Sequence, residues 1–510
     1  MPFGGVRIVD QMISYGAKLK QLANATPGWP AVTCQGVSLT YSEFHRRTNR
    51  LARGLALRGV TRGALVTVGL PNGLDFVAAC WAIWKLGATP QPISFRLPAA
   101  ELAAIIELAN PALVIAEGDA AGPWPSSSIA ELAALSDDEG DLPEVTAPTA
   151  RGVASGGSTG RPKLILSGGP GVTKAAMLEL SFWRMRRGGV SILPAPLYHT
   201  AGFAMMLDAI NIGAHLVILP RFDPEGVLAA IHTYRADWIF LVPTMMTRIW
   251  RLPDVMRTAY DLSSLKTLWH LAAPCPPWLK EAFIGWVGPD AVMERYGGAE
   301  SQAISEISGR EWLDRRGSVG RVIVGEMIAV GEDGQALPPG EVGEIYLRRP
   351  QGSPETYRYV GAVAKFLPGG WESLGDMGWF DADGYLYLAD RRTDMILVGG
   401  ANVYPAEVEA ALEEYPAVQS CAIIGLPDDD LGNRIHAIVN VRTPVTPDQL
   451  SAHLADRLVA YKLPRSYEFV DEPIRDDAGK VRRTALRDER IARMKADASL
   501  SGARHGGMGQ

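Results

Sequence analysis

Long apolar runs, paired cysteines and an excess of positive charge are all missing from this sequence of 510 residues. No run of about 18 apolar residues occurs, so a membrane-spanning helix is not expected. The four cysteines lie far apart and form no CxxC pair, which argues against a zinc site and a disulfide framework. A net charge of -6 argues against a general nucleic-acid binder.

The two ends of the chain carry no strong signals either. The first ten residues lack the basic start and apolar core of a secretory signal peptide, so we expect a cytoplasmic protein. The last residues are rich in glycine and polar side chains, and we expect a disordered tail over 491–510. The remaining composition, 47% hydrophobic and 21% charged, is typical of a globular protein.

Alternating strand and helix signals run through the first 300 residues. Thr40 and Glu43 form a capping box that predicts a helix with Phe44, Leu51 and Leu55 on one face. Uninterrupted apolar runs predict buried strands at 64–70, 112–115, 190–193, 215–219, 238–242 and 266–269. Such strands, joined by helices, indicate parallel sheets covered on both faces, so the sequence predicts an α/β fold.

The pattern changes twice further along. Gly and Pro turns separate short strand-like runs over 310–390, which predicts a small antiparallel sheet or barrel-like region. After 390, two helices, starting near Pro405 and at Thr446-Pro447, alternate with strands around 421–424 and 435–439. The second helix is expected to carry Leu450, Leu454, Leu458 and Tyr461 on one face. We therefore expect a large domain over 1–390 and a small α+β domain over 391–490.

A cluster of glycines and hydroxyls, Ser-Gly-Gly-Ser-Thr-Gly-Arg-Pro-Lys, occupies 155–163. The glycines allow a backbone to approach a phosphate, and the hydroxyls and ammonium group supply donors. It is not a Walker loop, because Pro162 separates the glycine from the lysine. Taken alone, the segment is equally well explained as a phosphate-binding loop or a flexible surface loop.

Four further segments have unusual residue combinations. They are Tyr-Gly-Gly-Ala-Glu at 296–300, Gly-Asp at 375–376 with an Asp-Gly hairpin signal after it, 390–409 with a Gly-Gly pair, and 475–483 with Lys480 after a glycine. A carboxylate such as Glu300 beside a phosphate loop is typical of a shared magnesium ion. Each segment alone also has a simple structural explanation, such as a turn or an exposed lysine.

In this order and spacing the five segments resemble the adenylate-forming superfamily of acyl-CoA synthetases, firefly-type luciferases and peptide-synthetase adenylation domains. The resemblance runs from about Leu39 to Arg483. It implies a mobile C-terminal domain and a two-step reaction. A carboxylate first attacks the α-phosphate of Mg·ATP to give an acyl-adenylate and pyrophosphate, and a second nucleophile, usually the thiol of CoA, then displaces AMP.

The resemblance also implies roles for individual residues. Lys480 corresponds to the catalytic lysine of the first step, and Thr159 and Glu300 correspond to the magnesium ligands. The ATP-binding residues would be Ser158, Thr159, Gly160, Lys163, Ala272, Ala273, Pro274, Tyr296, Gly297, Asp376 and Arg391. Among these, Tyr296 would stack on adenine, and Asp376 and Arg391 would bind the ribose.

The acid and the second substrate are assigned in the same way. The acyl pocket would be formed by His199, Phe203, Val242, Met245, Met246, Leu271 and Gly298. Gly399 and Gly400 would line the tunnel for the second substrate, and Thr393 would be the hinge. No cation or carboxylate in this set suits a substrate amine, so a hydrophobic carboxylic acid is expected: alicyclic, aromatic, steroid-like or fatty.

Three positions depart from the family pattern. Gly156 replaces a hydroxyl residue, Ala299 replaces the threonine before the glutamate, and Thr393 stands where relatives usually carry Asp or Lys. Losing the threonine hydroxyl is expected to cost about 1 kcal/mol of nucleotide or substrate binding. These departures predict a slow enzyme or one with unusual substrate preference.

The acceptor of the acyl group stays open. CoA is the first expectation, because it is the commonest second substrate of the superfamily and no carrier domain follows Arg483. A stand-alone ligase that passes the acyl group to an amino acid or another amine is the alternative. A non-catalytic nucleotide-binding protein is a third reading, against which Lys480 and Glu300 argue. A luciferase-like oxygenase is not favoured by any residue.

Overall fold

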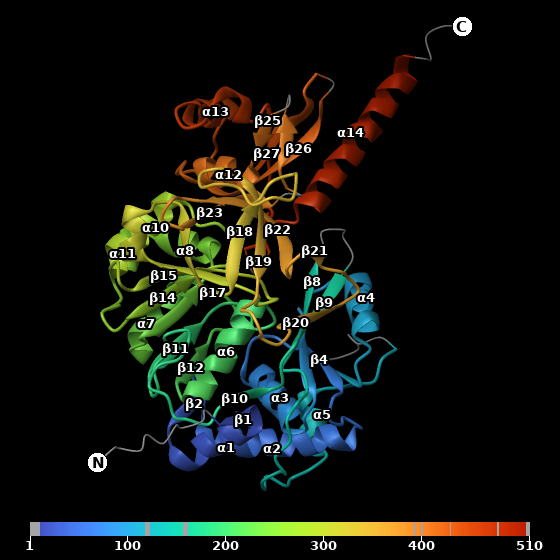
Figure 1. Ribbon diagram of the computed structural model, residues 1–510, viewed down its shortest axis with the longest axis vertical. Coiled ribbons are helices and arrows are strands. Elements are labelled where there is room, and N and C mark those ends of the chain that lie inside the picture. Colours follow the sequence, from blue (N-terminus) through green and yellow to red (C-terminus); the bar gives the residue numbers. More distant parts are fainter. Residues whose placement is uncertain are drawn as a thin grey trace.

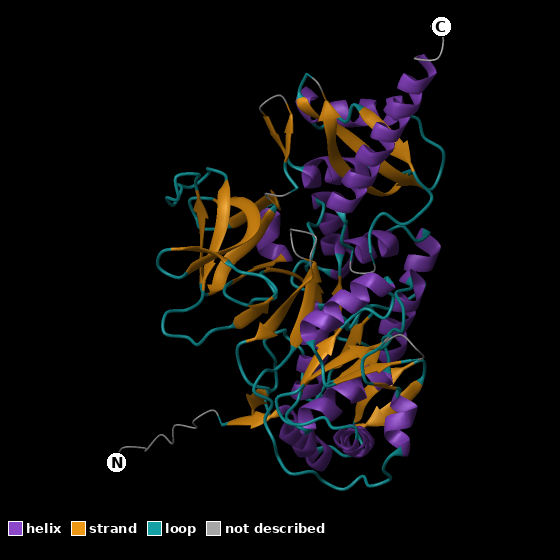
Figure 2. Cartoon of the chain, turned by 90° about the vertical axis from the view of Figure 1, so that its right-hand side faces the viewer, coloured by secondary structure: helices purple, strands orange, loops and turns teal. Residues whose placement is uncertain are grey.

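The computed structural model describes residues 11–117, 123–156, 162–391, 394–398, 401–428, 430–476 and 479–505. At 155–156, 390–391 and 496–505 only the backbone is described. Figure 1 shows a larger part formed by the blue, green and yellow segments and a smaller part, orange to red, above it. Figure 2 shows helices packed around the sheets of the larger part.

A parallel sheet forms the centre of the larger part. Its strands, in spatial order, are β15 (Val292–Tyr296), β14 (Thr267–His270), β13 (Trp238–Leu241), β11 (Val190–Leu193), β12 (His215–Ile218) and β2 (Pro30–Cys34). The antiparallel strand β3 (Val37–Thr40) pairs with β2 at the edge. The helices that follow these strands are α6 (Thr200–Ile212), α7 (Pro224–Tyr234), α8 (Pro243–Trp250), α9 (Asp254–Arg257), α10 (Pro277–Val287) and α11 (Gly309–Asp314). The expected α/β class is confirmed.

A second parallel sheet lies nearer the N-terminus. Its order is β5 (Thr89–Pro92), β4 (Leu65–Gly69), β6 (Leu113–Ala116) and β7 (Ser126–Ser127). Its helices are α1 (Tyr15–Ala25), α2 (Tyr41–Leu57), α3 (Leu74–Lys85), α4 (Ala99–Ala109) and α5 (Ile129–Ala134). The capping box of Thr40 and Glu43 is present at the start of α2, as the sequence predicts.

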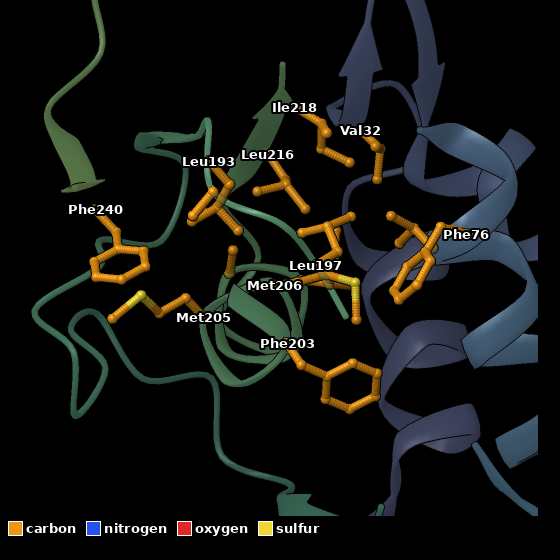
Figure 3. Close-up of a cluster of buried hydrophobic side chains, with 14 of the residues drawn as sticks. Val32, Phe76, Leu193, Leu197, Phe203, Met205, Met206, Leu216, Ile218 and Phe240 are labelled. Atoms are coloured by element: carbon orange, nitrogen blue, oxygen red, sulfur yellow. The ribbon is translucent and has the colours of Figure 1, made fainter. Parts of the chain in front are cut away.

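A large apolar core joins the two parallel sheets. Phe203 of α6 is fully buried and lies edge-on to Trp84 and Phe76 of α3, with ring centroids 5.8 and 6.4 Å apart. Figure 3 shows Phe203, Met205 and Met206 of α6 among side chains from the neighbouring strands. Burial of such large apolar side chains is the main favourable term in folding.

Two small antiparallel pairings complete the larger part. β8 (Gly152–Gly156), β9 (Pro162–Ser167) and β20 (Tyr357–Val360) form a three-stranded sheet in the order β20-β9-β8. β8 and β9 flank the glycine-rich segment predicted to bind phosphate. β1 (Met12–Ser14) pairs with β10 (Val172–Lys174).

Antiparallel strands extend the central sheet beyond β15. They are β16 (Ile304–Ser308), β17 (Ser318–Val324), β23 (Leu386–Arg391), β22 (Trp371–Phe380), β19 (Gly343–Arg348) and β18 (Glu326–Val330), with β21 (Lys365–Leu367) beside β22. The expected β-rich region over 310–390 is therefore an antiparallel sheet. The barrel alternative is wrong, because among the described strands β18 ends the path and does not pair back with β17.

The smaller part has a hydrophobic core of its own, which includes Val408, Leu412, Ile423 and Leu450. Its elements are β24 (Ile396–Val398), β25 (Ala401–Val403), α12 (Pro405–Glu413), β26 (Val418–Asp428), β27 (Gly432–Val441), α13 (Pro447–Ala455), the 3₁₀ helix η1 (Ala460–Lys462), β28 (Ser466–Phe469) and α14 (Arg483–His505). The α+β composition matches the expectation. The boundary at 390/391 stays a prediction.

Two expectations for this part are wrong in detail. The helix α13 ends at Ala455, so Leu458 and Tyr461 do not continue its apolar face. The tail expected to be disordered is helical to His505, because Leu486, Ile491 and Met494 of α14 pack against Ile424, Leu426 and Ile438. Arg490 also binds Glu468 at 2.9 and 3.0 Å and so anchors α14 to β28.

No helix within the described ranges combines the length and apolarity that crossing a membrane would require.

Candidate active site

Glu300, the predicted magnesium ligand, is a buried carboxylate with two partners. The Tyr359 hydroxyl donates to Glu300 Oε1 at 2.5 Å, and Lys163 Nζ lies 3.5 Å from the same oxygen. Glu300 is 5% exposed. A polar group so far removed from water needs such partners. The fold thus brings Lys163 and Glu300 together, although they are 137 positions apart in the numbering (300 − 163).

The turn that carries Glu300 is closely packed. A Cβ on Gly298 would lie 2.5 Å from Leu374 Cδ1 and 2.6 Å from Glu300 Oε2, so a larger residue there would have to displace these two side chains. Ser301, directly after the glutamate, has a left-handed backbone with φ of 58°. Non-glycine residues adopt this conformation rarely, and such strain is concentrated at functional sites.

The predicted adenine and ribose residues lie side by side. The Tyr296 hydroxyl donates to Asp376 Oδ2 at 2.7 Å. Asp376 of β22 is the Cα partner of Arg391 of β23 in the antiparallel ladder. The sequence predicts a common nucleotide site for these three residues. Asp376 and Arg391 lie on the adjacent strands β22 and β23, and Tyr296 of β15 reaches Asp376 through its hydroxyl. The side chain of Arg391 lies outside the described residues.

Lys480 lies in a hairpin that rests on the larger part. The bridge between Arg475 and Val481 closes this hairpin, and Lys480 N donates to Asp476 Oδ1 at 2.9 Å. Gly479 has a φ of 78°, and a Cβ there would lie 2.4 Å from Thr244 Oγ1 and 3.6 Å from Val242 Cγ2. The lysine is therefore held next to a wall of the predicted acyl pocket.

Other contacts also dock the smaller part on the larger one. Arg251, just after α8, donates to the carbonyl oxygens of Gln419 and Glu413 at 2.8 and 3.0 Å. Arg482 Nη1 lies 3.0 Å from Glu101 Oε2 of α4. These contacts, together with the approach of Gly479 to Thr244, hold the smaller part against the larger one.

The residues of the predicted acyl pocket fall into two groups. His199 at the start of α6, Leu271 after β14 and Gly298 are half-buried, so part of their surface is accessible. Phe203, Val242, Met245 and Met246 are buried and belong to the main hydrophobic core. For Phe203 the packing against Phe76 and Trp84 explains the side chain fully, and we do not carry it into the proposed pocket.

His270 lies two positions before Ala272, the first of the residues Ala272, Ala273 and Pro274 predicted to bind ATP, and is fully buried. Its Nδ1 is 3.8 Å from Glu294 Oε1, and Glu294 is bound by Lys280 at 2.5 Å. Burial lowers the pKa of His270 to about 4, so the ring is neutral at physiological pH. Ala272, which follows, has a left-handed φ of 78°, a further strained position beside Ala273 and Pro274.

Six predicted residues lie outside the described part of the chain. They are Ser158, Thr159 and Gly160 of the phosphate loop, the hinge residue Thr393 and the tunnel residues Gly399 and Gly400. Their assignments stay predictions. The ends of the phosphate loop are described, since β8 ends at Gly156 and β9 begins at Pro162.

Tyr359, which donates to the predicted magnesium ligand Glu300, was missed by the sequence analysis, and Tyr357 lies two positions before it. Both lie on β20, and their alternate spacing on a strand was the only available signal, because it places them on one face. Tyr359 contacts Glu300, 59 positions away, and Tyr357 contacts Glu372, 15 positions away. No local sequence pattern reveals either contact.

Mg²⁺ fits the donor set around Glu300 as an ion that arrives with ATP. Among the residues that the structure describes, no three His, Cys, Asp or Glu side chains gather closely enough to hold a metal. Mg²⁺ usually takes one or two protein carboxylates and completes its shell with phosphate oxygens and water. One buried carboxylate near the phosphate loop suits that coordination.

Comparison with known proteins agrees with this geometry. Residues 19–355 match the AMP-binding enzyme family, and residues 407–480 match the AMP-binding enzyme C-terminal domain. The chain belongs to the AMP-binding enzyme family. Membership confirms the expected enzyme class, an AMP-forming acid ligase of the acyl-CoA synthetase type.

Named relatives cover nearly the whole chain. A feruloyl-CoA synthase from Amycolatopsis is 33% identical over 478 residues, which cover 91% of this chain and 96% of the relative. A 2-succinylbenzoate–CoA ligase from Bacillus cereus is 28% identical over 474 residues, 92% of this chain and 97% of the relative.

A solved structure shows the same architecture. The o-succinylbenzoate CoA synthetase of Bacillus subtilis, in complex with its acyl-adenylate intermediate, is 25% identical with a TM-score of 0.78, covering 93% of this chain and 98% of that one. The same synthetase has also been solved with ATP and a magnesium ion, at a TM-score of 0.77, covering 93% of this chain and 99% of that one. ATP and Mg²⁺ are therefore used within the family.

Proposed function

We propose that this protein activates a hydrophobic carboxylic acid with ATP and transfers the acyl group to CoA. The contact of Gly479 with Thr244 is the observation that supports it most, because it sets the residue directly before Lys480 against the segment predicted to form a wall of the acid pocket. The names of the relatives, which are CoA synthetases and ligases of aromatic acids, support CoA as the acceptor.

In the first step the acid's carboxylate oxygen bonds to the α-phosphorus of ATP, and the bond from that phosphorus to the bridging oxygen of pyrophosphate breaks. Two anions must approach each other, so the ammonium of Lys480 between them lowers the barrier electrostatically. Tyr296 and Asp376 orient the nucleoside, and Lys163 neutralises the departing phosphates. Mg²⁺, held by Glu300 and Thr159 when bound, supplies further charge neutralisation to the phosphate oxygens.

In the second step the sulfur of CoA attacks the acyl carbon, and the bond between that carbon and the AMP oxygen breaks. The thiol proton leaves with solvent, so the products are an acyl thioester and AMP. We propose that Gly399 and Gly400 line the path of CoA and that a rotation about Thr393 removes Lys480 from the site first. Breaking the Arg251 and Arg482 contacts is then part of that rotation.

For the acid we propose a hydrophobic and most simply an aromatic carboxylic acid. His199, Leu271 and Gly298 form the accessible part of the proposed pocket, and none of them is a cation or carboxylate that would select an amino acid. The aromatic acids in the names of two relatives support the same choice. An apolar pocket with few polar groups discriminates between acids mainly by size and shape.

A product assay tests this function directly. The purified protein is incubated with ATP, Mg²⁺ and a panel of aromatic, alicyclic, steroid-like and fatty acids, with CoA or with a mixture of amino acids, and products are identified by mass spectrometry. Acyl-CoA formation with release of AMP and pyrophosphate is the expected result. Amide formation without CoA would identify an amide ligase instead, and ATP binding without pyrophosphate release for any acid would identify a non-catalytic binder.

A further inference from the structure

Tyr359 joins the phosphate-loop lysine to the predicted magnesium ligand. Its hydroxyl donates to Glu300 Oε1 at 2.5 Å. The ammonium of Lys163 lies over the Tyr359 ring in a cation–π interaction, with Nζ 4.0 Å from the ring centroid. Lys163 itself lies 3.5 Å from the same Glu300 oxygen. Tyr359 therefore touches both charged groups that are predicted to meet the metal and the phosphates of ATP.

The backbone of Tyr359 is fixed to the phosphate loop. In the antiparallel pairing of β20 with β9, Tyr359 is the Cα partner of Ile165, two residues after Lys163. β9 begins at Pro162, directly after the glycine-rich segment. A strand pair holds its side chains at fixed spacing. Tyr359 therefore fixes the position of Glu300 relative to the end of the phosphate loop.

A second tyrosine supports the first without touching Glu300. The ring of Tyr357 lies edge-on to that of Tyr359, with centroids 4.7 Å apart. Its hydroxyl donates to Glu372 Oε2 at 2.5 Å, and Gln302 donates to the same oxygen. The two tyrosines thus make analogous bonds to two different glutamates.

Both tyrosines are half-buried on the wall of an open cleft of about 760 Å³, outside the main apolar core. Removing a single hydroxyl there leaves the rings and their packing in place. A Tyr to Phe change at either position is therefore a test of the hydrogen bond and not of folding.

We propose that Tyr359 is a positioning residue that holds Glu300 ready for the metal of Mg·ATP and keeps the ion pair of Glu300 with Lys163, now at 3.5 Å, from tightening. This inference rests on the proposed function, because it assigns Glu300 to the metal. The hydroxyl occupies one carboxylate oxygen and fixes the plane of the group, while the ring holds the competing ammonium to one side. Hydrogen bonds to metal-binding carboxylates commonly set metal affinity in this way.

In the pair of Tyr359 and Glu300, the tyrosine hydroxyl is the hydrogen-bond donor. The Tyr359 hydroxyl can donate to the carboxylate, whereas an ionised carboxylate can only accept. Of the two partners of Glu300 Oε1 described above, only the ammonium of Lys163 would remain if the hydroxyl were removed. A tighter ion pair between them would then compete with Mg²⁺ for the carboxylate.

Tyr359→Phe and the matched control Tyr357→Phe test the proposal in two assays. The first is binding of Mn²⁺·ATP in the absence of any acid, followed by electron paramagnetic resonance of the manganese. The second is the Mg²⁺ concentration that half-saturates acid-dependent ATP–pyrophosphate exchange. Tyr359→Phe is expected to weaken Mn²⁺ binding and to raise the half-saturating Mg²⁺ concentration about tenfold, whereas Tyr357→Phe leaves both near wild type.

The outcomes separate this inference from the proposed function. Equal metal dependence in Tyr359→Phe, Tyr357→Phe and wild type, or tighter binding in Tyr359→Phe, would overturn the positioning role while the adenylation activity stands. A loss of exchange in both variants without a change in metal dependence would also overturn it, since it indicates a structural role. A wild type that shows no exchange with any acid would refute the proposed function, and the manganese assay would still decide the role of Tyr359.

Discussion

Gly479 lies against Thr244 so closely that a Cβ on the glycine would be 2.4 Å from the threonine Oγ1. The two residues come from opposite parts of the chain, the C-terminal hairpin of Lys480 and the N-terminal end of α8. The contact places the backbone directly before Lys480 against the start of α8.

Gly479→Ala should slow adenylation by about a hundredfold, because misplacing a catalytic group by about 1 Å has that effect. The new methyl group would push the hairpin away from Thr244. Gly432→Ala is the matched control, since Gly432 has a similar φ of 76° but no atom within 4 Å of its Cβ position. ATP–pyrophosphate exchange measures the rate. Equal losses in the two variants would point to backbone strain alone.

Lys480→Ala should reduce adenylation by roughly a hundred- to a thousandfold, the usual effect of removing one preorganised charge. Attack of CoA on a preformed acyl-adenylate should stay largely intact, because Lys480 has no part in that step. Stopped-flow or quench measurements of each half-reaction provide the comparison. Lys495→Ala, at an exposed position of α14, is the control. The assignment fails if both half-reactions fall by the same factor.

Tyr296→Phe should raise the KM for ATP by about three- to tenfold, the effect of one hydrogen bond to a charged group. The ring remains available to stack on adenine, but Asp376 loses the donor that orients its carboxylate. Tyr387→Phe removes a similar bond, from Tyr387 to Asp381 at 3.3 Å, away from this site. An unchanged KM in Tyr296→Phe, or an equal rise in Tyr387→Phe, would contradict the assignment.

Arg251→Ala should weaken docking of the smaller part by about 1 to 3 kcal/mol, because two carbonyl groups lose their donor. Adenylation should slow and hydrogen exchange at 413–419 should rise. Arg442→Ala is the control, since Arg442 donates to the Pro416 carbonyl within the smaller part. If exchange at 413–419 rises equally in both variants, Arg251 has no special role in docking.

His270 should make the protein less stable in acid. Burial lowers its pKa from 6.5 to about 4, so between these values the unfolded chain binds a proton that the folded chain does not. The free energy of unfolding therefore falls as pH drops through this window, by up to about 1.4 kcal/mol per pH unit from this group. Urea unfolding of wild type and His270→Gln from pH 4 to 7 measures the difference. Parallel curves for the two proteins would contradict the prediction.

Local sequence patterns gave the positions of many elements. The apolar runs at 190–193 and 215–219 became β11 and β12, and the capping box at Thr40 began α2, because each signal depends on neighbours within a turn or strand. The patterns failed where tertiary contacts decide. The apolar residues of α14 are widely spaced and form no clear helical pattern in the sequence, yet they pack on β26 and β27.

In the candidate site, too, the sequence predicts which residues take part, whereas tertiary contacts decide how their side chains are arranged. The residue types and order of its motifs identified Lys163, Glu300, Tyr296, Asp376 and Lys480, and two contacts, Lys163 with Glu300 and Tyr296 with Asp376, are present. Phe203 was assigned to the pocket because of its motif, but packing of its ring against α3 places it in the core. A motif does not say which way a side chain points.

The sequence by itself determined the family, the α/β class and the chemical groups available for adenylation, because these depend on residue identity and spacing. Only the tertiary structure decided which groups meet. The hydroxyl of Tyr359 on Glu300 and the contact of Gly479 with Thr244 join segments 59 and 235 positions apart (359 − 300 and 479 − 244). Such contacts follow from strand pairing and docking between layers, which are properties of the whole chain and not of any one motif.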